Sequence, residues 1–467
     1  ARFQHRTTCA FDCGQLTSVS AWTASLHPYG YTLLLSSIYI KWSHSALNED
    51  ALFYRERFKM YFRVFPLVIS MALFASQCLA HPLTQSLGNG EDSNHTNELL
   101  ALVLASSLCQ PTLLGGNIVG CSLALNGDVS TPYGPAEGSS TAGDQDGIGN
   151  SAQFFVPLGL ATNGTSLFVT ESFGNDIREI SLPGDLVITF AGPGPGSSVS
   201  GDTDATGNSA RFNAPGAVTT DGTNLYIAEL TNNKIRKIDL STGVVTTLAG
   251  PAEGAQTSGD ADGIGNSARF TSPSGITTDG TSLYVADADN NKIRKIDIGT
   301  GLVTTFAGPV AGDQSPGDLD GTGNAARFSA PAAITTDGVN LYVADKGNNK
   351  IRKIVIATAE VTTIAGPAEG STSSGRTNGT GNAARFNGPA GIATDGTNLY
   401  VSDSANDVIR KVVISTAVVT QIAGNVIYGD DDGNGVNASF HSPHGITTDG
   451  RYLYVVDTSN NKIRKIQ

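Results

Sequence analysis

The sequence predicts an all-β protein: a six-bladed β-propeller of four-stranded antiparallel blades, with an N-terminal strand that closes the last blade. Three observations support this fold class. A seven-residue segment recurs six times, turn signals divide each repeat into four short strands, and the two ends of the repeat region complement each other. The composition agrees, because 55 glycines and a charged fraction of 15% in 467 residues suit a protein rich in tight turns.

The recurring segment sets the number of blades. NNKIRKI occurs at 232–238, 290–296, 348–354 and 460–466, and diverged copies stand at 174–180 and in a stretch that ends at Val412. Successive copies lie 58 residues apart, except the last, which follows after 54. One small sheet cannot bury both of its faces alone, whereas six sheets around an axis can, and a closed ring leaves only short edges.

The unit at 268–308 shows how the turns divide a repeat. We expect strands near 275–278, 283–287, 292–297 and 303–307, because Asp-Gly, Asn-Asn and Gly-Thr-Gly turn signals separate these stretches. The third stretch places isoleucines at both parities of the strand. This pattern indicates a sheet that is covered on both faces.

The two ends of the repeat region indicate how the ring closes. The last unit stops at Gln467, after its third strand, and therefore lacks a fourth. The segment GDVSTPYGPAEG at 127–138 precedes the first unit and aligns with GVVTTLAGPAEG at 243–254. We therefore expect residues 129–133 to form the missing outer strand of the last blade and to lock the two ends together.

These residues closely resemble the NHL-repeat family of propellers. The family pattern of a PxGI strand, an LYVAD strand, an N-x-x-I-R-K strand and a TxAG strand recurs in all six units and covers residues 127–467. The resemblance implies the six-bladed fold but selects no single function, because this fold has many roles. A long Gly/Ser/Asp-rich insertion between units, such as 250–267, is a departure from the pattern.

The first 126 residues have a different composition. All five cysteines precede residue 122, so no disulfide can form within the propeller. Met60 is followed by Arg63, by an apolar run and by small residues up to Ala80, which is typical of a secretory signal peptide at 60–80. Residues 1–59 are then a non-native upstream extension, or alternatively a genuine disordered region.

Residues 81–126 are expected to be a linker, and Ile-Val-Gly-Cys at 118–121 resembles a bacterial lipobox that would lipidate Cys121. We therefore expect a secreted, periplasmic or outer-envelope protein, with or without a lipid anchor and with no transmembrane span in its mature form. We expect a monomer. The net charge of −13 repels phosphate backbones and argues against a nucleic-acid partner.

Paired aspartates recur in the insertions that join the units. Two carboxylates beside a flexible glycine supply oxygen ligands that suit Ca²⁺. The alternative is that each aspartate caps a turn through nearby backbone amides. The metal or ligand candidates are Asp144, Asp146, Asp202, Asp204, Asp260, Asp262, Asp318, Asp320, Asp430 and Asp432. The fifth unit departs from this pattern, with Arg376 and Asn378 instead.

Two further features recur or depart from the repeat. In a hairpin, Arg294 falls on the same face as Asp287, and Arg352 on the same face as Asp345, which predicts charge-complemented packing between blades. The recurring Phe and Pro before each unit are expected to be structural. Glu171 and Glu229 replace the aspartate of the LYVAD motif, and His444 stands where other units have Ser or Ala.

We therefore predict a binding scaffold that presents acidic loops on one face, with a protein or a cell-surface glycan as partner. Loops of variable length on a rigid frame commonly carry recognition. One alternative follows from the resemblance, since some similar propellers are divalent-metal lyases or lactonases that act at the channel mouth; His444 would then be catalytic. A second alternative is a purely structural repeat protein.

Overall fold

The computed structural model describes residues 16–22, 37–42, 111–120 and 122–467, with side chains for the last two ranges. The predicted signal peptide and Cys121 lie outside the described residues. No helix in the described part of the chain is long and apolar enough to span a membrane.

The chain divides into two compact units, 1–93 and 94–467. In the first unit, β1 (Leu16–Trp22) pairs with β2 (Ser37–Trp42) in an antiparallel hairpin.

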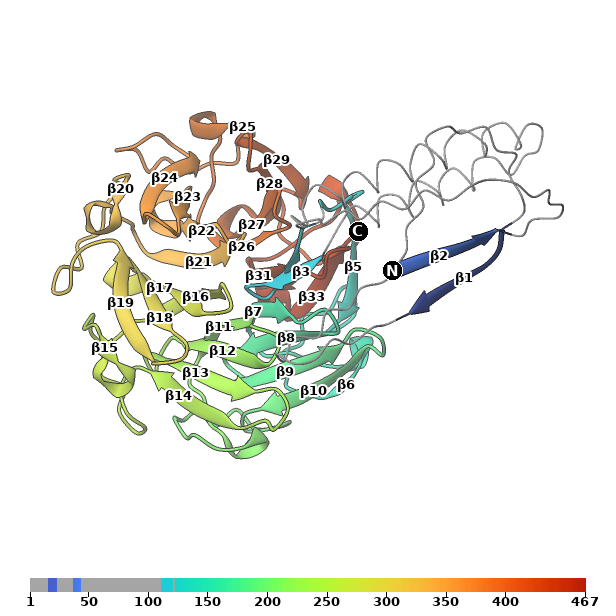
Figure 1. Ribbon diagram of the computed structural model, residues 1–467, viewed down its shortest axis with the longest axis horizontal. Helices are drawn as coiled ribbons and strands as arrows, with labels where there is room; N and C mark the ends of the chain where they lie inside the picture. Colours follow the sequence, from blue (N-terminus) through green and yellow to red (C-terminus); the bar gives the residue numbers. More distant parts are fainter. Residues whose placement is uncertain (1–15, 23–36, 43–110, 121) are drawn as a thin grey trace, which may run out of the picture. The chain divides into compact units, whose positions relative to one another are not determined.

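The second unit is a six-bladed β-propeller, as predicted (Figure 1). Each blade contains four antiparallel strands, which we name a to d from the channel outward. The a strands are β7 (Pro157–Thr162), β11 (Pro215–Thr220), β16 (Pro273–Thr278), β21 (Pro331–Thr336), β26 (Pro389–Thr394) and β31 (Pro443–Thr448). The b strands are β8 (Ser166–Glu171), β12 (Asn224–Glu229), β17 (Ser282–Asp287), β22 (Asn340–Asp345), β27 (Asn398–Asp403) and β32 (Leu453–Asp457).

The outer strands complete the blades. The c strands are β9 (Asp176–Ser181), β13 (Lys234–Asp239), β18 (Lys292–Asp297), β23 (Lys350–Val355), β28 (Val408–Val413) and β33 (Lys462–Ile466). The d strands are β10 (Leu186–Ala191), β14 (Val245–Ala249), β19 (Leu302–Ala307), β24 (Glu360–Ala365), β29 (Val418–Ala423) and, in blade 6, β5 (Asp128–Tyr133). The predicted bounds of blade 3 agree with these to within two residues.

The ring closes where the sequence predicts. In blade 6, β5 pairs antiparallel with β33, with Val129 opposite Ile466 and Tyr133 opposite Ile463. The main-chain amide of Gly127 also donates to the carbonyl oxygen of Gln467 at 2.8 Å. The first and last strands of the propeller therefore share one sheet.

The d–a loops, which join one blade to the next, add a strand that was not predicted from the sequence. In five blades a two-residue strand from the d–a loop pairs with the d strand and becomes the outermost strand. These strands are β6 (Gly147–Ile148), β15 (Gly263–Ile264), β20 (Gly321–Thr322), β25 (Gly379–Thr380) and β30 (Gly433–Asn434). Blade 2 has only an isolated bridge there, between Thr206 and Val244. Two residues carry too little periodicity to be recognised from sequence.

Short 3₁₀ turns shape both sets of loops. Those in the d–a loops are η1 (Gly149–Ser151), η2 (Gly207–Ser209), η3 (Gly265–Ser267), η5 (Gly323–Ala325), η7 (Gly381–Ala383) and η9 (Gly435–Asn437). Those in the b–c turns are η4 (Ala288–Asn290), η6 (Lys346–Asn348), η8 (Ser404–Asn406) and η10 (Thr458–Asn460).

The residue after each b–c turn, an asparagine in five blades and Asp407 in blade 5, also connects neighbouring blades. Asn291 adopts the left-handed conformation (φ 55°), which asparagine tolerates better than most residues. Its side-chain oxygen accepts a hydrogen bond from the amide of Ala330 in the next blade at 2.8 Å. Asn461 accepts one from Val156 at 2.9 Å, so the chain of contacts runs from the last blade to the first.

The hydrophobic core lies between the blades rather than within them. One cluster combines Tyr226 and Ile235 of blade 2 with Phe270 and Leu283 of blade 3, all fully buried. Because each sheet packs against a neighbour on both faces, its strands are apolar at both parities, as the sequence indicated. The recurring Phe belongs to these interfaces.

Candidate functional site

Each blade contains a buried network of acids and bases. In blade 3, Arg294 donates from Nη1 to Asp287 Oδ2 (2.8 Å) and from Nη2 to Asp262 Oδ1 (2.7 Å). Its Cζ lies 5.2 Å from the centroid of the Phe270 ring, which is a cation–π distance. In blade 4, Arg352 donates to Asp345 at 2.8 Å. The predicted pairing of these arginines with the b strand is therefore confirmed.

The acid in the b strand of blade 3, Asp287, is completely buried beside the guanidinium group of Arg294. Burial raises the pKa of Asp287 to about 6, and the charge of Arg294 and the hydrogen bond from Asn290 act in the opposite direction. The raised pKa reflects the cost of burying this carboxylate, and the guanidinium group of Arg294 offsets part of that cost. A buried pair of this kind is costly to break from one side only.

A lysine at the first position of the c strand extends the network to the d–a loops. Lys292 Nζ donates to Asp260 Oδ2 at 2.6 Å and to the carbonyl oxygen of Val310 at 2.9 Å. The same contact pairs Lys234 with Asp202, Lys350 with Asp318 and Lys462 with Asp430. Each ammonium group therefore holds two consecutive d–a loops together.

The central channel forms a pocket of about 250 Å³ at the face of the d–a loops and b–c turns. All six a strands line it, with residues that include Leu158, Gly216, Gly275, Ala333, Gly391 and His444. Neighbouring a strands approach closely: a Cβ on Gly275 would lie 2.8 Å from the carbonyl oxygen of Ala332. This packing explains why the third residue of every a strand is glycine or alanine.

A hairpin from the predicted linker fills the opposite end of the channel. It consists of β3 (Thr112–Leu114) and β4 (Asn117–Val119), joined by two glycines with φ of 57° and 75°. The carbonyl oxygen of Gly116 accepts hydrogen bonds from the amide of Thr162 (2.9 Å) and from Thr447 Oγ1 (2.6 Å). The channel is therefore closed at the end of the a–b turns and open at the other.

Among the described residues that line the pocket, two have titratable side chains, His444 and Lys346, and none is acidic. Burial lowers the pKa of His444 below its usual value, so the imidazole is neutral at pH 7. His444 Nδ1 lies 2.9 Å from the carbonyl oxygen of Ser442. Because a carbonyl oxygen only accepts, Nδ1 carries the proton and Nε2 is the unprotonated nitrogen.

Comparisons with known proteins agree with this architecture. The chain is 29% identical over 321 residues to NHL repeat-containing protein 2 of Homo sapiens, in a match that covers 61% of this chain and 42% of that protein. It is 30% identical over 298 residues to the Arabidopsis thaliana protein SUPPRESSOR OF QUENCHING 1, chloroplastic, covering 61% of this chain and 27% of the relative.

The chain carries an NHL-repeat β-propeller. It spans only 27% to 42% of the length of the curated relatives it matches, and no family model matches it.

Solved structures show the same fold as this NHL propeller. A Bacteroides thetaiotaomicron protein of unknown function superposes with a TM-score of 0.53 at 22% identity, covering 73% of this chain and 75% of that one. A protein from the same organism, described as an auxiliary nutrient binding protein, gives 0.54 at 16% identity, with 73% and 76% covered.

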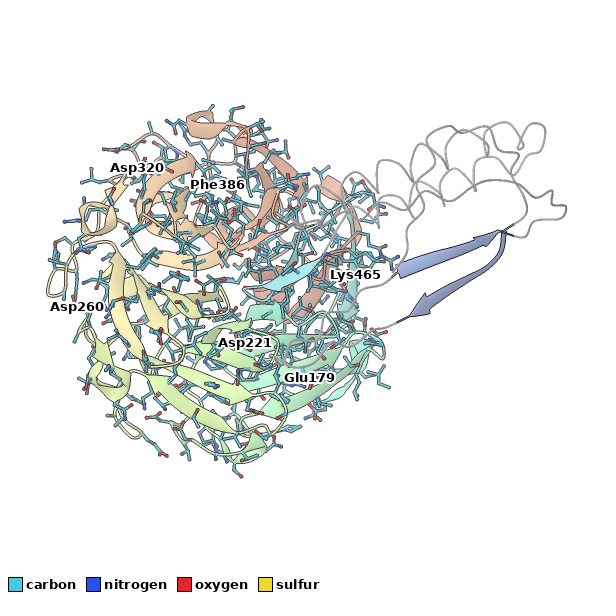
Figure 2. All side chains as sticks on the ribbon, in the orientation of Figure 1. Glu179, Asp221, Asp260, Asp320, Phe386 and Lys465 are labelled. Carbon is cyan, nitrogen blue, oxygen red and sulfur yellow. The ribbon has the colours of Figure 1, made fainter. Side chains whose placement is uncertain are left out.

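The ten aspartates predicted as ligand or metal candidates all lie in these networks. The first of each pair contacts the c-strand lysine or loop amides, and the second contacts the c-strand arginine. The second-position pairs are Asp146–Arg178 (2.9 Å), Asp204–Arg236 (2.6 Å), Asp262–Arg294 (2.7 Å), Asp320–Arg352 (2.8 Å) and Asp432–Arg464 (2.8 Å). Figure 2 shows Asp260 and Asp320 at the outer rim of the propeller, away from the channel.

These contacts favour the structural alternative for the paired aspartates of the NHL propeller. In the part of the chain that the structure describes, no group of three or more His, Cys, Asp or Glu side chains converges, so side chains alone do not form a metal site there. Calcium binding at these pairs, and catalysis by His444, stay untested predictions. Neither Glu171 nor Glu229 lines the pocket; each pairs with the arginine of its own blade at 3.1 Å.

The hairpin that closes the channel of this NHL propeller was not predicted from the sequence. Its signal was present as Leu-Leu-Gly-Gly-Asn-Ile-Val at 113–119, two apolar stretches around a Gly-Gly turn that requires positive φ at both positions. A Cβ on Gly115 would lie 2.1 Å from Thr277 Oγ1, so the channel also demands glycine there.

Proposed function

We propose that this protein is an extracytoplasmic binding scaffold whose ligand enters the open end of the channel. The observation that carries the proposal is the pocket itself, which is open toward the d–a loops and closed behind by β3 and β4. Ligand pockets are concave, mostly apolar and equipped with a few polar groups, and this lining has Ser274, Lys346 and His444 among apolar and main-chain groups.

The chemistry of the pocket is compatible with a loop of a partner protein or a terminal sugar of a cell-surface glycan. The acidic d–a loops would provide the surrounding contacts. Two structural neighbours described as auxiliary nutrient binding proteins, from Bacteroides thetaiotaomicron and Bacteroides ovatus, fit a binding role for this fold.

Filling the pocket tests the proposal. Ala332 lines the pocket, and tryptophan at this position should obstruct it. The matched control is Val339→Trp, at an a–b turn, where the side chain is 66% exposed. The immobilised protein is presented to a glycan array and to envelope proteins; a ligand of the pocket is lost with Ala332→Trp and retained with Val339→Trp. A ligand retained equally by both variants contradicts binding in the channel.

The location has a separate test. If residues 60–80 are a signal peptide, the mature protein begins at His81 and is recovered outside the cytoplasm. N-terminal sequencing of the protein expressed from Met60 measures this directly, and a retained Met60 contradicts it. If Cys121 is lipidated after cleavage of the preceding bond, the mature protein also loses residues 112–119, which intact mass spectrometry detects.

A further inference from the structure

Blade 1 lacks the lysine that completes the network in blades 2, 3, 4 and 6. Asp176 stands at the first position of its c strand, where blade 2 has Lys234. The cross-strand pair is therefore Glu171 opposite Asp176, whereas blade 2 has Glu229 opposite Lys234. Like charges directly opposite each other destabilise a sheet.

Both acids of this pair are fully buried and incompletely bonded. Asp176 and Glu171 have no exposed surface. Among the buried carboxylates that the structure describes, Asp176 alone has both oxygens without a hydrogen-bond donor, and Glu171 Oε2 also lacks one. Burial and the charge of Asp176 raise the pKa of Glu171 well above its usual value.

The free oxygens point to a common position. A Cβ added to Gly174 would lie 2.6 Å from Glu171 Oε2 and 3.2 Å from Asp176 Oδ1. In blade 2 the equivalent residue is Asn232, which donates to Glu229 Oε1 at 3.1 Å. Blade 1 has therefore lost two donors, an amide and an ammonium group, and gained a carboxylate.

The acceptors that surround the ammonium group in other blades are kept in blade 1. Asp144 corresponds to Asp202, and its oxygens accept from the amides of Gly196 (2.8 Å) and Ser197 (3.0 Å). Asp202 likewise accepts from the amide of Gly254 at 2.8 Å, in addition to its lysine. Blade 1 thus keeps the aspartate that contacts the lysine in other blades but lacks the lysine itself.

The charge difference between the blades is two. The network of blade 2 has three acids (Asp202, Asp204, Glu229) and two bases (Lys234, Arg236). The network of blade 1 has four acids (Asp144, Asp146, Glu171, Asp176) and one base (Arg178). A buried excess of this size must be relieved, either by a proton held on one of the acids or by a bound cation.

Blade 5 shows that loss of the lysine alone does not produce this arrangement. There Val408 replaces the lysine and Arg376 replaces its aspartate partner, so the contact is absent from both sides. The acid Asp403 retains its donors Asn406 (2.8 Å) and Arg410 (2.9 Å). Blade 1 is the case in which the acids remain and the base is missing.

We propose that blade 1 binds a divalent cation, of the Ca²⁺ class, in the place that a lysine ammonium group occupies in the other blades. Ca²⁺ accepts six to eight oxygen ligands in flexible geometry, from carboxylates, carbonyls and water. Asp176 and Glu171 supply the free carboxylate oxygens, and Asp144 adds charge beside them. The remaining ligands would have to be main-chain oxygens and water, because no three acidic or imidazole side chains converge in the described part of the chain.

The experiment compares the full chain with the variant Asp176→Lys, which copies blade 2 into blade 1. After removal of divalent ions with EDTA, wild-type protein should unfold at a lower temperature than the variant. A hundredfold excess of CaCl₂ over its Kd should raise the wild-type midpoint by roughly 5 °C, with one saturable site by calorimetry, and should leave Asp176→Lys unchanged.

The control Asp289→Lys makes the same change of charge at an exposed b–c turn of blade 3 and should keep the full response to CaCl₂. NaCl at matched ionic strength separates screening from binding. The proposal is overturned if wild-type protein shows no saturable binding, if Asp176→Lys still responds, or if Asp289→Lys loses the response. It is independent of the proposed function, because the pocket is unaffected by each variant.

Discussion

Blades 1 and 2 follow the same strand order and lie one repeat apart, yet their interiors carry different charges. In blade 2, Lys234 contacts Asp202 and the carbonyl oxygen of Ala252, and Arg236 contacts Glu229 and Asp204. In blade 1 the arginine contacts persist through Arg178, while the lysine position holds an acid.

The comparison distinguishes the arginine, which every blade keeps, from the lysine, which blade 1 has replaced by an acid. The arginine occurs in all six blades, fully buried, and joins three segments of each. The lysine occurs in four, so the fold does not depend on it in every position. In blade 1, the replacement of the lysine by Asp176 leaves buried acids without a balancing base, which lowers stability. We therefore propose that these acids bind a ligand and do not only fill space in the core.

The largest effect should come from making blade 2 resemble blade 1. Lys234→Asp removes one partner of a buried ion pair and places an acid opposite Glu229. We expect the free energy of unfolding to fall by about 3–5 kcal/mol in EDTA, because a buried charge is left unpaired. Urea denaturation measures it. The control Lys237→Asp, two residues before the end of the c strand in the same blade, lies outside the network and should have little effect.

Blade 5 allows a sharper test of the lysine contact. Val408→Lys alone places an ammonium group near Arg376 and should destabilise the protein by about 2 kcal/mol. Adding Arg376→Asp restores the partner found in blade 4. The double variant should therefore lose less free energy of unfolding than the two single variants lose together. A double-mutant cycle should give a coupling energy of about 1–3 kcal/mol. Simple additivity would mean that the contact contributes nothing.

The smallest effect concerns the a–b turns. Tyr226 donates to Asp221 Oδ2 at 2.8 Å in blade 2, whereas blade 1 has Phe168 and Asn163 at these positions. Asp221→Asn copies the turn of blade 1 and should cost about 1 kcal/mol at pH 7. Burial is the largest single influence and raises the pKa of Asp221, but the hydrogen bonds from Thr223 and Asn224 together outweigh it, so the pKa is lowered overall.

This lowered pKa gives the variant a pH dependence with a definite sign. A carboxylate with a lowered pKa stabilises the folded state above its unfolded pKa, and the contribution is lost as the pH falls through the folded value. The difference in stability between wild-type protein and Asp221→Asn should therefore shrink below about pH 4. Thermal unfolding at pH 7 and pH 3 measures it, and a constant difference contradicts the assignment.

Much of the propeller could be predicted because its information is local and repeated six times. Strand bounds followed from turn residues, and ring closure followed from the match between 127–138 and 243–254. The hairpin at 112–119 was missed because it occurs once, so no repeat marked it, and because the neighbouring Cys121 favoured another interpretation.

The site was predicted less completely than the fold. The pairing of Arg294 with Asp287 followed from strand register alone. That Asp262 reaches the same guanidinium depends on the path of a loop 32 residues earlier, which no periodicity encodes. The importance of Asp176 is visible only once Glu171 is known to lie opposite it, since a single diverged copy of a repeat carries no indication of its partner.

The hairpin that fills the a–b end gives the channel the topology of a cup rather than a tube. Whatever enters must leave by the same opening, so exchange depends on the d–a loops alone and nothing can be threaded through the disc. A long flexible molecule could insert one terminus but could not pass through. Chain ends and loop tips are therefore the ligands that best suit a channel closed at one end.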